Sequence, residues 1–375
     1  MARHAHCRSR PPDVGADRSG CDPRQCADFA FNCRRAGDGG AQGGCVWSWC
    51  GACGARGAGW RRRALAVATL GEARMLREAG IGAPILALGY TPPWQVAQAA
   101  RLGVTITVFD HDVARACAAV AGTGVTVTVH VEVDTGMART GLSVDELGPF
   151  LRSLAGLPGV HVEGLYTHFA DADAADPGAA EAQLRRFCGA LDAVTGAGLR
   201  PPVVHAANSA AMLRLPGARC DMVRPGIACY GLAPSPWVTL PAALRPALSF
   251  HSEVAQVRDL PPGTPVSYGG TFVTRRHSRI ATIPVGYADG MRRAPPWREV
   301  LVRGRRAPVV GRICMDYAMI DVTDHADVRR GDLVTLIGAQ GDACITVAEV
   351  ASWLGTISYD VVATILSRVP REVSE

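Results

Sequence analysis

Among the residues that could do chemistry, a single phenol stands out, because Tyr268 is followed directly by two glycines. It lies where the sequence changes character: apolar runs alternating with helical patterns precede it, and short strands with turns follow it. A tyrosine at such a junction is most often a packed aromatic whose hydroxyl is hydrogen-bonded. It becomes a candidate catalytic group only if other polar residues of the chain converge on it.

Further polar residues fall where apolar, strand-like runs end. They are Asp134 and Arg139, His168, His205 with Asn208 and Ser209, and Arg224. Taken singly, each has a simpler explanation, because a lone histidine beside a strand is more often a satisfied core residue and an aspartate often caps a turn. At the carboxyl ends of barrel strands, however, such groups line one mouth, where an active site forms. Ser209 and the turn at residues 225–227 could offer a hydroxyl and backbone N–H groups to a phosphate.

The elements that must position these residues alternate between strand and helix from residue 64 onward. Strand-like runs lie at 64–68, 84–88, 104–109, 125–133, 160–166, 203–205 and 222–224, and helical patterns at 70–79, 94–102, 113–120, 144–155 and 180–197. Continuous apolar strands separated by helices predict a parallel sheet covered on both faces. Because no glycine-rich dinucleotide fingerprint follows the first strand, we expect an α/β fold of the (β/α)8 TIM-barrel type over residues 64–241, with its first strand missing or scrambled.

The chain turns to β structure from about residue 242. Short strands are predicted at 248–257, 271–273, 280–285, 299–302, 308–310, 319–322 and 333–337, broken by proline, glycine and aspartate turns. Helical patterns over 347–354 and 361–367 follow. Residues 242–375 are therefore expected to form a separate, mainly β domain.

Charge is spread unevenly along the 375 residues, whose formal net charge is +5. Residues 1–63 hold 11 Arg against 5 Asp and no Glu, a net +6, so the remaining 312 residues carry −1. A nearly neutral main body gives no electrostatic footprint for nucleic acid. The N-terminus has no apolar signal core, and no run reaches the roughly 20 apolar residues of a membrane span. We therefore expect a cytoplasmic protein without a membrane partner.

The first 63 residues form an anomalous segment with neither a helical nor a strand period. Cys50 and Cys53 form a Cys-x-x-Cys pair there, with Cys45 upstream. Such a pair reads as half a zinc site or a redox pair, but a second properly spaced ligand pair is missing. We therefore expect no metal site.

Eight motifs follow one another along residues 64–375. They are VDTGMARTG at 133–141, YTHFA at 166–170, HAANSA at 205–210, VRPGIACYG at 223–231, VSYG at 266–269, GYADG at 286–290, GRICMD at 311–316 and RVPR at 368–371. In this order they resemble the alanine racemase family, fold-type III enzymes that depend on pyridoxal 5′-phosphate. Their collinear order makes a chance match unlikely. The resemblance implies the interconversion of L- and D-alanine, which supplies D-alanine for cell-wall peptidoglycan, by a homodimer.

The resemblance also implies catalytic roles. Tyr268 would be the base that takes the α-proton of L-alanine, reaching into the barrel of the partner subunit. His168 beside it would tune the phenol, because a free tyrosine has a pKa of about 10 and needs such help to act as a base near neutrality. Arg139 would contact the cofactor ring oxygen and the substrate carboxylate side, and the backbone N–H of Met315 would contact the carboxylate itself.

Cofactor contacts are implied in the same way. Arg224 would hydrogen-bond the pyridine nitrogen, and a permanent cation there keeps that nitrogen unprotonated and limits side reactions. The phosphate would be held by Ser209, Gly226, Ile227 and Tyr359.

One departure from the family pattern is conservative in charge. Many members carry a carbamylated lysine that presents a carboxylate to the arginine, and this chain has Glu132 at that position. A glutamate supplies the negative charge directly, so we expect a salt bridge between Glu132 and Arg139.

The second departure is severe, because this chain contains no lysine. Family members hold the cofactor as a Schiff base on a lysine in a Lys-Ala-Asp-Ala-Tyr-Gly-His-Gly type stretch, and that lysine is also the second base. The stretch should fall at residues 42–50, and reading the codons of that segment one base later can spell it in order. We therefore hypothesise that most of the segment before Ala64 is read in a wrong frame.

Two other functions stay open. The first is a non-catalytic relative that binds pyridoxal phosphate or an amino acid without turnover. The second is an amino-acid decarboxylase of the same barrel class, although the motifs at 286–290 and 311–316 resemble racemases specifically. Alanine and serine are not separated as substrates by the sequence.

Overall fold

The computed structural model describes residues 6–9, 47–50 and 63–373, and the chain divides into two compact units. The first unit holds the described residues from β2 (Trp47–Cys50) to Cys229, together with Ala233–Leu244. The second holds β1 (His6–Ser9), Tyr230–Leu232 and the residues from Arg245 onward. Within the described ranges, no helix is long and apolar enough to cross a membrane.

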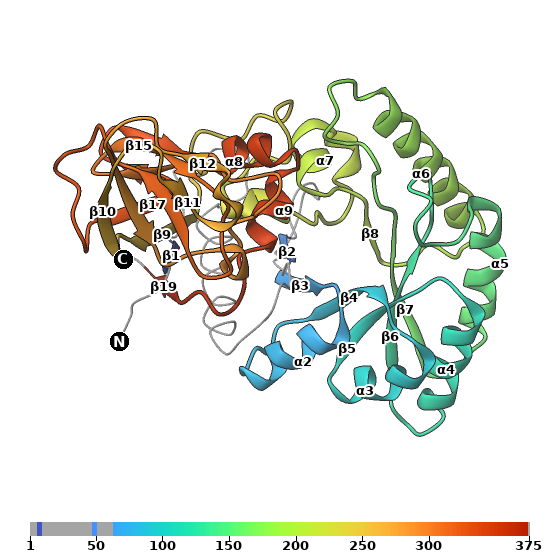
Figure 1. The fold of residues 1–375 in the computed structure, drawn as a ribbon. Helices are drawn as coiled ribbons and strands as arrows, with labels where there is room; N and C mark the ends of the chain where they lie inside the picture. The colour runs from blue at the N-terminus through green and yellow to red at the C-terminus, as the bar shows by residue number, and fades with distance from the viewer. Residues whose placement is uncertain (1–5, 10–46, 51–62, 374–375) are drawn as a thin grey trace. The chain divides into compact units, whose positions relative to one another are not determined.

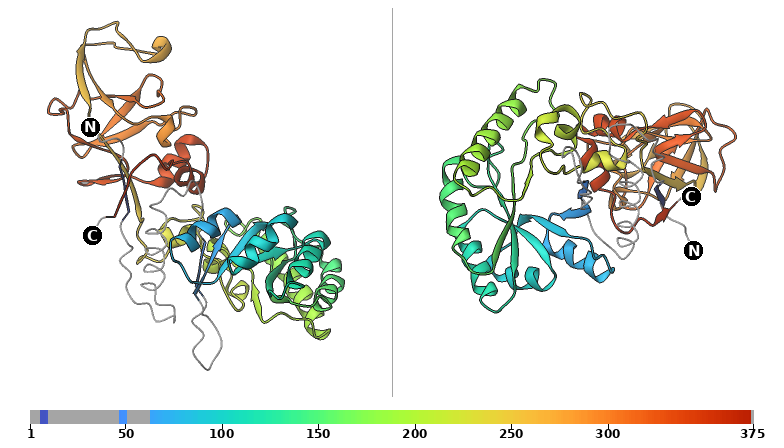
Figure 2. Two further views of the ribbon diagram at one scale, coloured as in Figure 1. Left: turned by 90° about the horizontal axis from the view of Figure 1, so that it is seen from below. Right: turned by 180° about the vertical axis from the view of Figure 1, so that it is seen from behind.

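A curved parallel sheet forms the first unit, with the strand order β2-β3-β4-β5-β6-β7-β8. Its parallel strands are β3 (Arg63–Val67), β4 (Ile85–Tyr90), β5 (Val104–Val108), β6 (Val127–Glu132), β7 (Val160–Tyr166) and β8 (Val203–His205), and β2 pairs antiparallel with β3. Helices α2 (Leu70–Glu78), α3 (Val96–Arg101), α4 (His111–Ala121), α5 (Val144–Ala155) and α6 (Gly178–Gly196) lie along its outer side (Figures 1 and 2). The helices therefore cover the convex face and leave the concave face for polar groups.

Local sequence signals explain these elements. The strands are rich in β-branched residues whose side chains are fully buried, such as Val67, Ile106 and Val129. Helix α2 begins at a capping box, in which Thr69 accepts from the backbone N–H of Glu72 and the Glu72 side chain accepts in return. The expected α/β barrel class followed by a mainly β domain is confirmed. The helix over 144–155 was predicted with the boundaries that the structure gives.

The far edge of this sheet differs from expectation. The predicted strand at 222–224 is wrong, because Met222 and Val223 are isolated bridge positions, of which Met222 pairs in parallel with His205. The backbone N–H of Arg224 turns instead to the carbonyl of Ala207, at 2.8 Å, and Pro225 has no N–H to continue a ladder. Among the described residues no strand pairing joins β8 to β2, so the sheet is open.

The second unit is mainly β structure. Its strands are β9 (Leu248–Glu253), β10 (Gln256–Leu260), β11 (Pro265–Val266), β12 (Phe272–Val273), β13 (Ser278–Ile283), β14 (Glu299–Val302), β15 (Arg305–Val310), β16 (Ala318–Asp321), β17 (Leu333–Gln340), β18 (Ala343–Ile345) and β19 (Arg371–Val373). The main sheet runs β10-β13-β16-β15-β14-β17-β9-β1-β19, and β11 pairs with β12 in a separate ribbon. Helices α8 (Val347–Leu354) and α9 (Ser358–Ala363) accompany it.

Several boundaries in this unit differ from the predictions, and two of the differences have a clear cause. The single run expected at 248–257 is two strands, because the chain changes partner: Val254 donates to Asp332 O and Ala255 to Thr282 O. The last helix begins three residues earlier than the apolar pattern suggested and ends at Ala363. Its first turn contains Asp360, whose carboxylate accepts from the Thr356 hydroxyl at 2.8 Å and favours a helix N-terminus.

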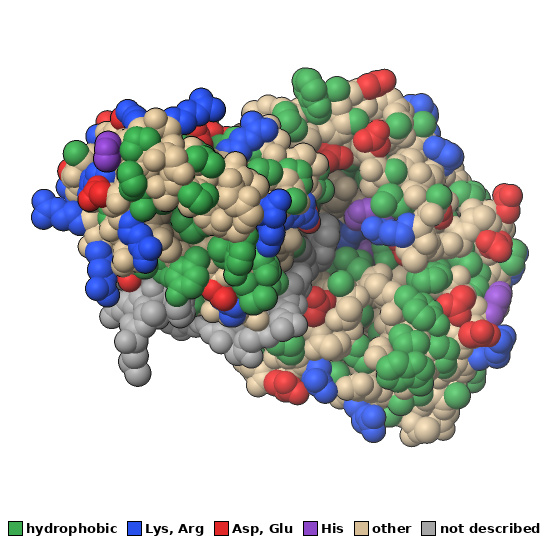
Figure 3. All heavy atoms as spheres, viewed as in Figure 1, with side chains coloured by type: hydrophobic (Ala, Val, Ile, Leu, Met, Phe, Trp, Pro, Cys, Tyr) green, Lys and Arg blue, Asp and Glu red, His purple; other side chains and the backbone are tan. Residues whose placement is uncertain are grey.

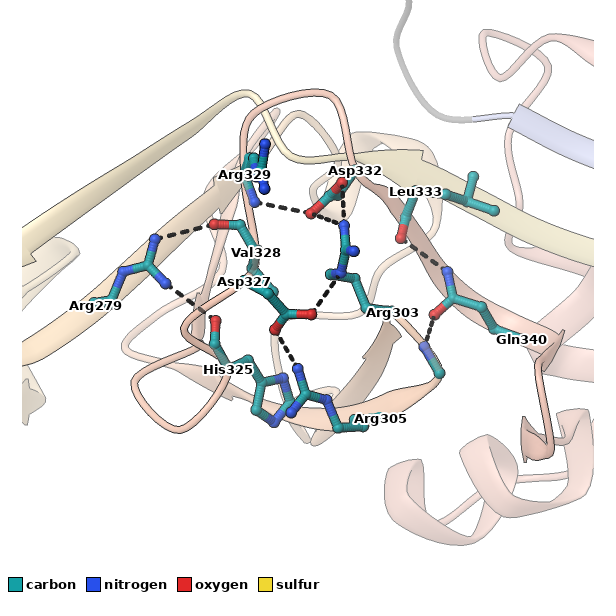
Figure 4. Close-up of polar contacts among 11 residues, drawn as sticks. Arg279, Arg303, Arg305, His325, Asp327, Val328, Arg329, Asp332, Leu333 and Gln340 are labelled. Carbon is teal, nitrogen blue, oxygen red and sulfur yellow. Dashed lines mark hydrogen bonds and ion pairs between the residues drawn. The ribbon is translucent and has the colours of Figure 1, made fainter.

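An arginine-rich cluster fixes the loop between β16 and β17 (Figure 4). Arg303 forms ion pairs with Asp327 at 2.8 Å and Asp332 at 3.2 Å, and Arg305 also pairs with Asp327. Arg279 donates to two backbone carbonyls of the same loop. Positive and negative side chains are likewise interspersed with exposed hydrophobic ones on the visible face of this unit (Figure 3). Such half-exposed pairs are worth about 0–1 kcal/mol each, so the cluster shapes the loop more than it stabilises the domain.

Candidate active site

Arg224 is the centre of the polar site in the first unit, where it is 1% exposed. Its Nη1 donates to His205 Nδ1 at 2.7 Å. Its Nη2 lies 2.9 Å from Thr167 O, 3.1 Å from Ala206 O and 3.2 Å from His168 Nδ1. Burial lowers the pKa of Arg224 to about 10, so the guanidinium is still a cation at neutral pH. A buried cation held by this many acceptors has one orientation.

His168 follows β7 and faces this guanidinium. Because arginine only donates, His168 Nδ1 must accept the hydrogen bond, and the proton of the neutral ring lies on Nε2. Burial, followed by the charges of Arg224 and Arg139, lowers the pKa of His168 to about 3. The ring is therefore a neutral donor through Nε2 over the whole physiological range.

A small donor cradle lies beside Arg224. The Ser209 hydroxyl oxygen accepts from the backbone N–H of Gly226 at 2.8 Å and from that of Ala228 at 3.3 Å. Asn208 caps the following helix α7 (Ser209–Arg214) through Ala211 N–H. With both acceptor positions of Ser209 in use, its own proton is left to donate. The chain between Gly226 and Ala228 is buried here, as expected for a cradle that encloses an anion.

Asp134 folds the loop that carries Arg139. Its carboxylate accepts from the backbone N–H groups of Gly136, Met137 and Ala138, each at 2.8 Å. Gly141 closes the loop with φ of +110°, where a Cβ would lie 2.8 Å from the backbone nitrogen of Asp134. Arg139 is exposed at the end of this loop, yet close enough for its charge to lower the pKa of His168.

The salt bridge expected between Glu132 and Arg139 is not formed, and that prediction is wrong. Glu132 is buried, and its Oε2 accepts from the Thr140 hydroxyl at 2.8 Å. Burial raises the pKa of Glu132, while this hydrogen bond and the charge of Arg139 act in the opposite direction. The neighbouring hydroxyl satisfies the carboxylate because the arginine side chain extends toward solvent.

Tyr268 begins a short helical turn of the second unit, η4 (Tyr268–Gly270), and its side chain is 63% exposed. Ser267 adopts φ of +64°, and its hydroxyl donates to Arg312 O at 2.5 Å. Gly311 allows the close approach of the two segments, because a Cβ there would lie 2.7 Å from Val266 O. The phenol is therefore held on a pinned turn and is not a packed core aromatic.

Three other motifs of the second unit meet around Arg368. Its Nε donates to the buried Asp289 at 2.8 Å, and its Nη2 donates to Asp316 at 2.6 Å. Gly286 lies against Met315, where a Cβ would come within 2.3 Å of the Met315 carbonyl oxygen. The backbone N–H of Met315 has no hydrogen-bond acceptor among the described residues. Its assignment to the substrate carboxylate stays a prediction.

Comparison with known proteins identifies the family. The model of the alanine racemase N-terminal domain matches residues 55–234, and that of the C-terminal domain matches residues 247–373. The chain belongs to the alanine racemase family. Its curated relative "Alanine racemase" of Desulfovibrio desulfuricans is 47% identical over 319 residues, which cover 84% of each chain. The crystal structure of alanine racemase from Bacillus anthracis with bound L-Ala-P has a TM-score of 0.79 at 43% identity, covering 83% of this chain and 81% of the other.

The same fold also serves other amino acids among its relatives. A structure named histidine racemase, from Leuconostoc mesenteroides, has a TM-score of 0.76 at 30% identity and covers 83% of each chain. The alanine racemase fold alone therefore does not fix the amino-acid substrate.

The structure brings together only part of the predicted site. His168, Ser209, Arg224, Gly226 and Ile227 gather in the first unit, whereas Tyr268, Met315 and the half-buried Tyr359 belong to the second. Their catalytic and cofactor roles stay predictions. The stretch proposed to be out of frame is residues 42–50. Its first part, 42–46, lies outside the described residues, and its second part forms the strand β2 (Trp47–Cys50). Cys45 and Cys53 also lie outside the described residues.

Sequence reasoning missed two members of the polar core, His130 and Glu163. Both lie inside apolar strands: His130 is hydrogen-bonded to His205, and Glu163 is hydrogen-bonded to His130. A histidine flanked by Val129 and Val131 in a buried strand was the available signal, since an apolar strand accommodates such a group only with hydrogen-bond partners.

Proposed function

We propose that the intact gene product is an alanine racemase that works with pyridoxal 5′-phosphate, and that the chain with this exact sequence is impaired. The observation that carries the proposal is the buried guanidinium of Arg224 between two neutral histidines, next to the Ser209 cradle. When bound, the cofactor withdraws electrons from the α-carbon of an amino acid and thereby acidifies its proton. The roles of the protein's residues follow from the donors they offer.

The residues fit the non-covalent contacts of this cofactor. Among the described residues, neither Arg224 Nε–H nor the second proton of Nη1 has an acceptor, so a donor remains for a pyridine nitrogen. The Ser209 hydroxyl supplies a donor for a phosphate oxygen, together with the turn at Gly226 and Ile227. Tyr359 of α9 would add a phenol to the same phosphate. The residues do not fit the covalent contact, because the chain has no lysine to bond the cofactor.

Proton transfer would depend on Tyr268 and His168. The exposed phenol of Tyr268 on its pinned turn can reach a second molecule, and we propose that it serves the barrel of a partner subunit in a homodimer. Because Arg224 occupies Nδ1 of His168, the ring can stabilise a phenolate only by donating from Nε2. This donation would assist Tyr268 as the base for the α-proton of L-alanine. Arg139 and the free N–H of Met315 would hold the substrate carboxylate.

Further exposed side chains of the second unit support the homodimer. Tyr287, Met315 and Tyr317 are 38%, 53% and 48% exposed. Large aromatic and methionine side chains are enriched at protein interfaces, which makes these residues candidates for contacts with a second subunit. The cytoplasmic location and the supply of D-alanine for peptidoglycan are predictions of the same proposal.

The missing lysine has an explanation that the gene can test. We propose that the first barrel strand is encoded one nucleotide out of register before Ala64. This is supported by the family match, which begins only at residue 55. Sequencing the DNA decides the matter, because a lysine requires AAG across codons 42 and 43. Any other triplet at that position refutes the idea.

A comparison of two proteins tests the function. In equilibrium dialysis, the chain with this sequence is expected to bind pyridoxal phosphate without a covalent bond. Its alanine racemisation, followed by chiral chromatography, should be near background. A frame-corrected chain should racemise alanine robustly. Absence of racemisation in the frame-corrected chain would refute the function, and a robust rate from the uncorrected chain would refute the role given to the lysine.

Two controls separate the alternatives. Arg224→Leu should weaken cofactor binding about tenfold or more if the guanidinium holds the pyridine nitrogen. Carbon dioxide release from alanine by the frame-corrected chain would instead indicate a decarboxylase. Binding without turnover by that chain would indicate a non-catalytic relative. Serine and histidine assayed beside alanine define the substrate.

A further inference from the structure

A chain of four side chains runs from the site to the rim of the first unit. Arg224 Nη1 lies 2.7 Å from His205 Nδ1, and His205 Nε2 lies 2.9 Å from His130 Nδ1. His130 Nε2 then lies 3.3 Å from Glu163 Oε2. The two histidines are 0% and 2% exposed, whereas the Glu163 side chain is 28% exposed. A buried cation is thus connected to a carboxylate at the surface.

The donors of this chain can point in one direction only. Arginine has no acceptor, so His205 Nδ1 accepts and the proton of that neutral ring lies on Nε2. His205 therefore donates to His130 Nδ1, which leaves the His130 proton on Nε2, facing Glu163. Burial lowers the pKa of both histidines, in agreement with two neutral rings. The carboxylate of Glu163 can only accept when ionised, so it completes the sequence of donors.

Packing holds both rings in the planes that these bonds require. Tyr166 stacks on His205 with ring centroids 4.7 Å apart and an interplanar angle of 12°. The guanidinium carbon of Arg224 lies 5.0 Å from the centre of the same Tyr166 ring. His130 lies directly against Gly164, where a Cβ would come within 2.5 Å of Nδ1. A side chain at position 164 would displace the ring that links the two ends.

We propose that Glu163 and His130 are positioning residues that anchor the His205 ring, whose tautomer Arg224 sets, and thereby hold Arg224 as an oriented donor. The inference deepens the proposed function, because Arg224 is the residue assigned there to the cofactor nitrogen. The alternative is that both histidines only satisfy each other in the core. The two accounts differ in what Glu163 does: a positioning carboxylate anchors the His130 Nε2–H and so steadies the rings behind Arg224, whereas a surface carboxylate does not.

Nuclear magnetic resonance of the full chain with ¹⁵N-labelled histidine tests this without cofactor. At neutral pH, the long-range ¹H–¹⁵N correlations of His130 and His205 should show the Nε2–H form for both. Glu163→Leu removes the acceptor of the His130 Nε2–H, so this proton should exchange faster while Arg224 keeps His205 in the Nε2–H form. Hydrogen exchange of the Arg224 guanidinium protons should also become about tenfold faster, because the rings behind the guanidinium are no longer anchored by that hydrogen bond.

Matched variants separate the contact from non-specific damage. Glu163→Gln keeps an oxygen acceptor and should preserve the tautomers and the slow exchange within about twofold. His161→Gln, at an exposed position of the same strand, should change neither measurement. An Nδ1–H form of His205 in the parent chain, or unchanged exchange of the Arg224 guanidinium protons in Glu163→Leu, would overturn the proposal. If the tautomers are as expected but no pyridoxal phosphate binds, the proposed function fails and the positioning role stands.

Discussion

Acid should destabilise the first unit through histidines that cannot take up protons in the folded state. Burial lowers the pKa of His168 to about 3 and that of His205 well below its ordinary value of 6.5. In the unfolded chain both titrate near 6.5. Between these values the unfolded state binds more protons than the folded state, so stability falls as pH falls. The sign is therefore loss on acidification, beginning near pH 6.5.

The magnitude follows from linkage. Each such histidine lowers the free energy of unfolding by about 1.4 kcal/mol for every pH unit below its pKa in the unfolded chain. From pH 7 to pH 5 one histidine thus removes about 2 kcal/mol, and His168 with His205 about 4 kcal/mol. That is a large share of the 5–15 kcal/mol that typically stabilises a domain. Burial, together with the charge of Arg224, keeps both rings from taking up a proton in the folded state.

Urea unfolding at pH 7 and pH 5 measures the effect. His168→Asn should lose about 2 kcal/mol less than the parent chain over that interval, because asparagine does not titrate. His277→Asn replaces an exposed histidine in the second unit and should track the parent chain. Equal losses in His168→Asn and the parent chain would refute the assignment of a neutral, buried ring.

Three further predictions concern packing and charge, each measured by urea unfolding. Gly164→Ala should lower the free energy of unfolding by about 1–3 kcal/mol, because the new Cβ would clash with His130. Gly189→Ala in α6 has open space around it and should be neutral or stabilising. Equal effects of the two substitutions would contradict the close approach of Gly164 to His130. Arg368→Leu should cost about 1–3 kcal/mol because it leaves the buried Asp289 without its cation. Arg276→Leu breaks an exposed pair with Asp324 and should cost clearly less, so the reverse order would contradict this prediction. Burial raises the pKa of Glu132, so at pH 7 the ionised side chain makes the folded state less stable than the protonated one would. Glu132→Gln should therefore be more stable than the parent chain at pH 7, and this difference should disappear near pH 4.5. A difference in stability that does not change with pH would contradict the raised pKa.

The sequence was informative wherever a local pattern determines the structure. The strand at 160–166 and the helix at 347–354 were predicted with their observed bounds, because apolar periodicity marked them clearly. Arg224 was recognised as a site residue, but the strand predicted at 222–224 does not form, because the Arg224 N–H donates to Ala207, a contact that the local pattern does not reveal. His130 and Glu163 were missed for a similar reason: their roles depend on rings brought together across three strands.

Under the proposed function, the contacts of Arg224 would let the groups assigned to the pyridine nitrogen and the phosphate assemble without the residues before Ala64. The acceptors of Arg224 lie at the end of β8 or directly after β7 and β8, and the two histidines of β6 and β8 support it from behind. None of these described contacts involves a residue before Ala64. A parallel sheet builds each binding group from neighbouring strands, so we expect a frame-corrected chain to add a strand and one amine beside donors that are already oriented by their own hydrogen bonds.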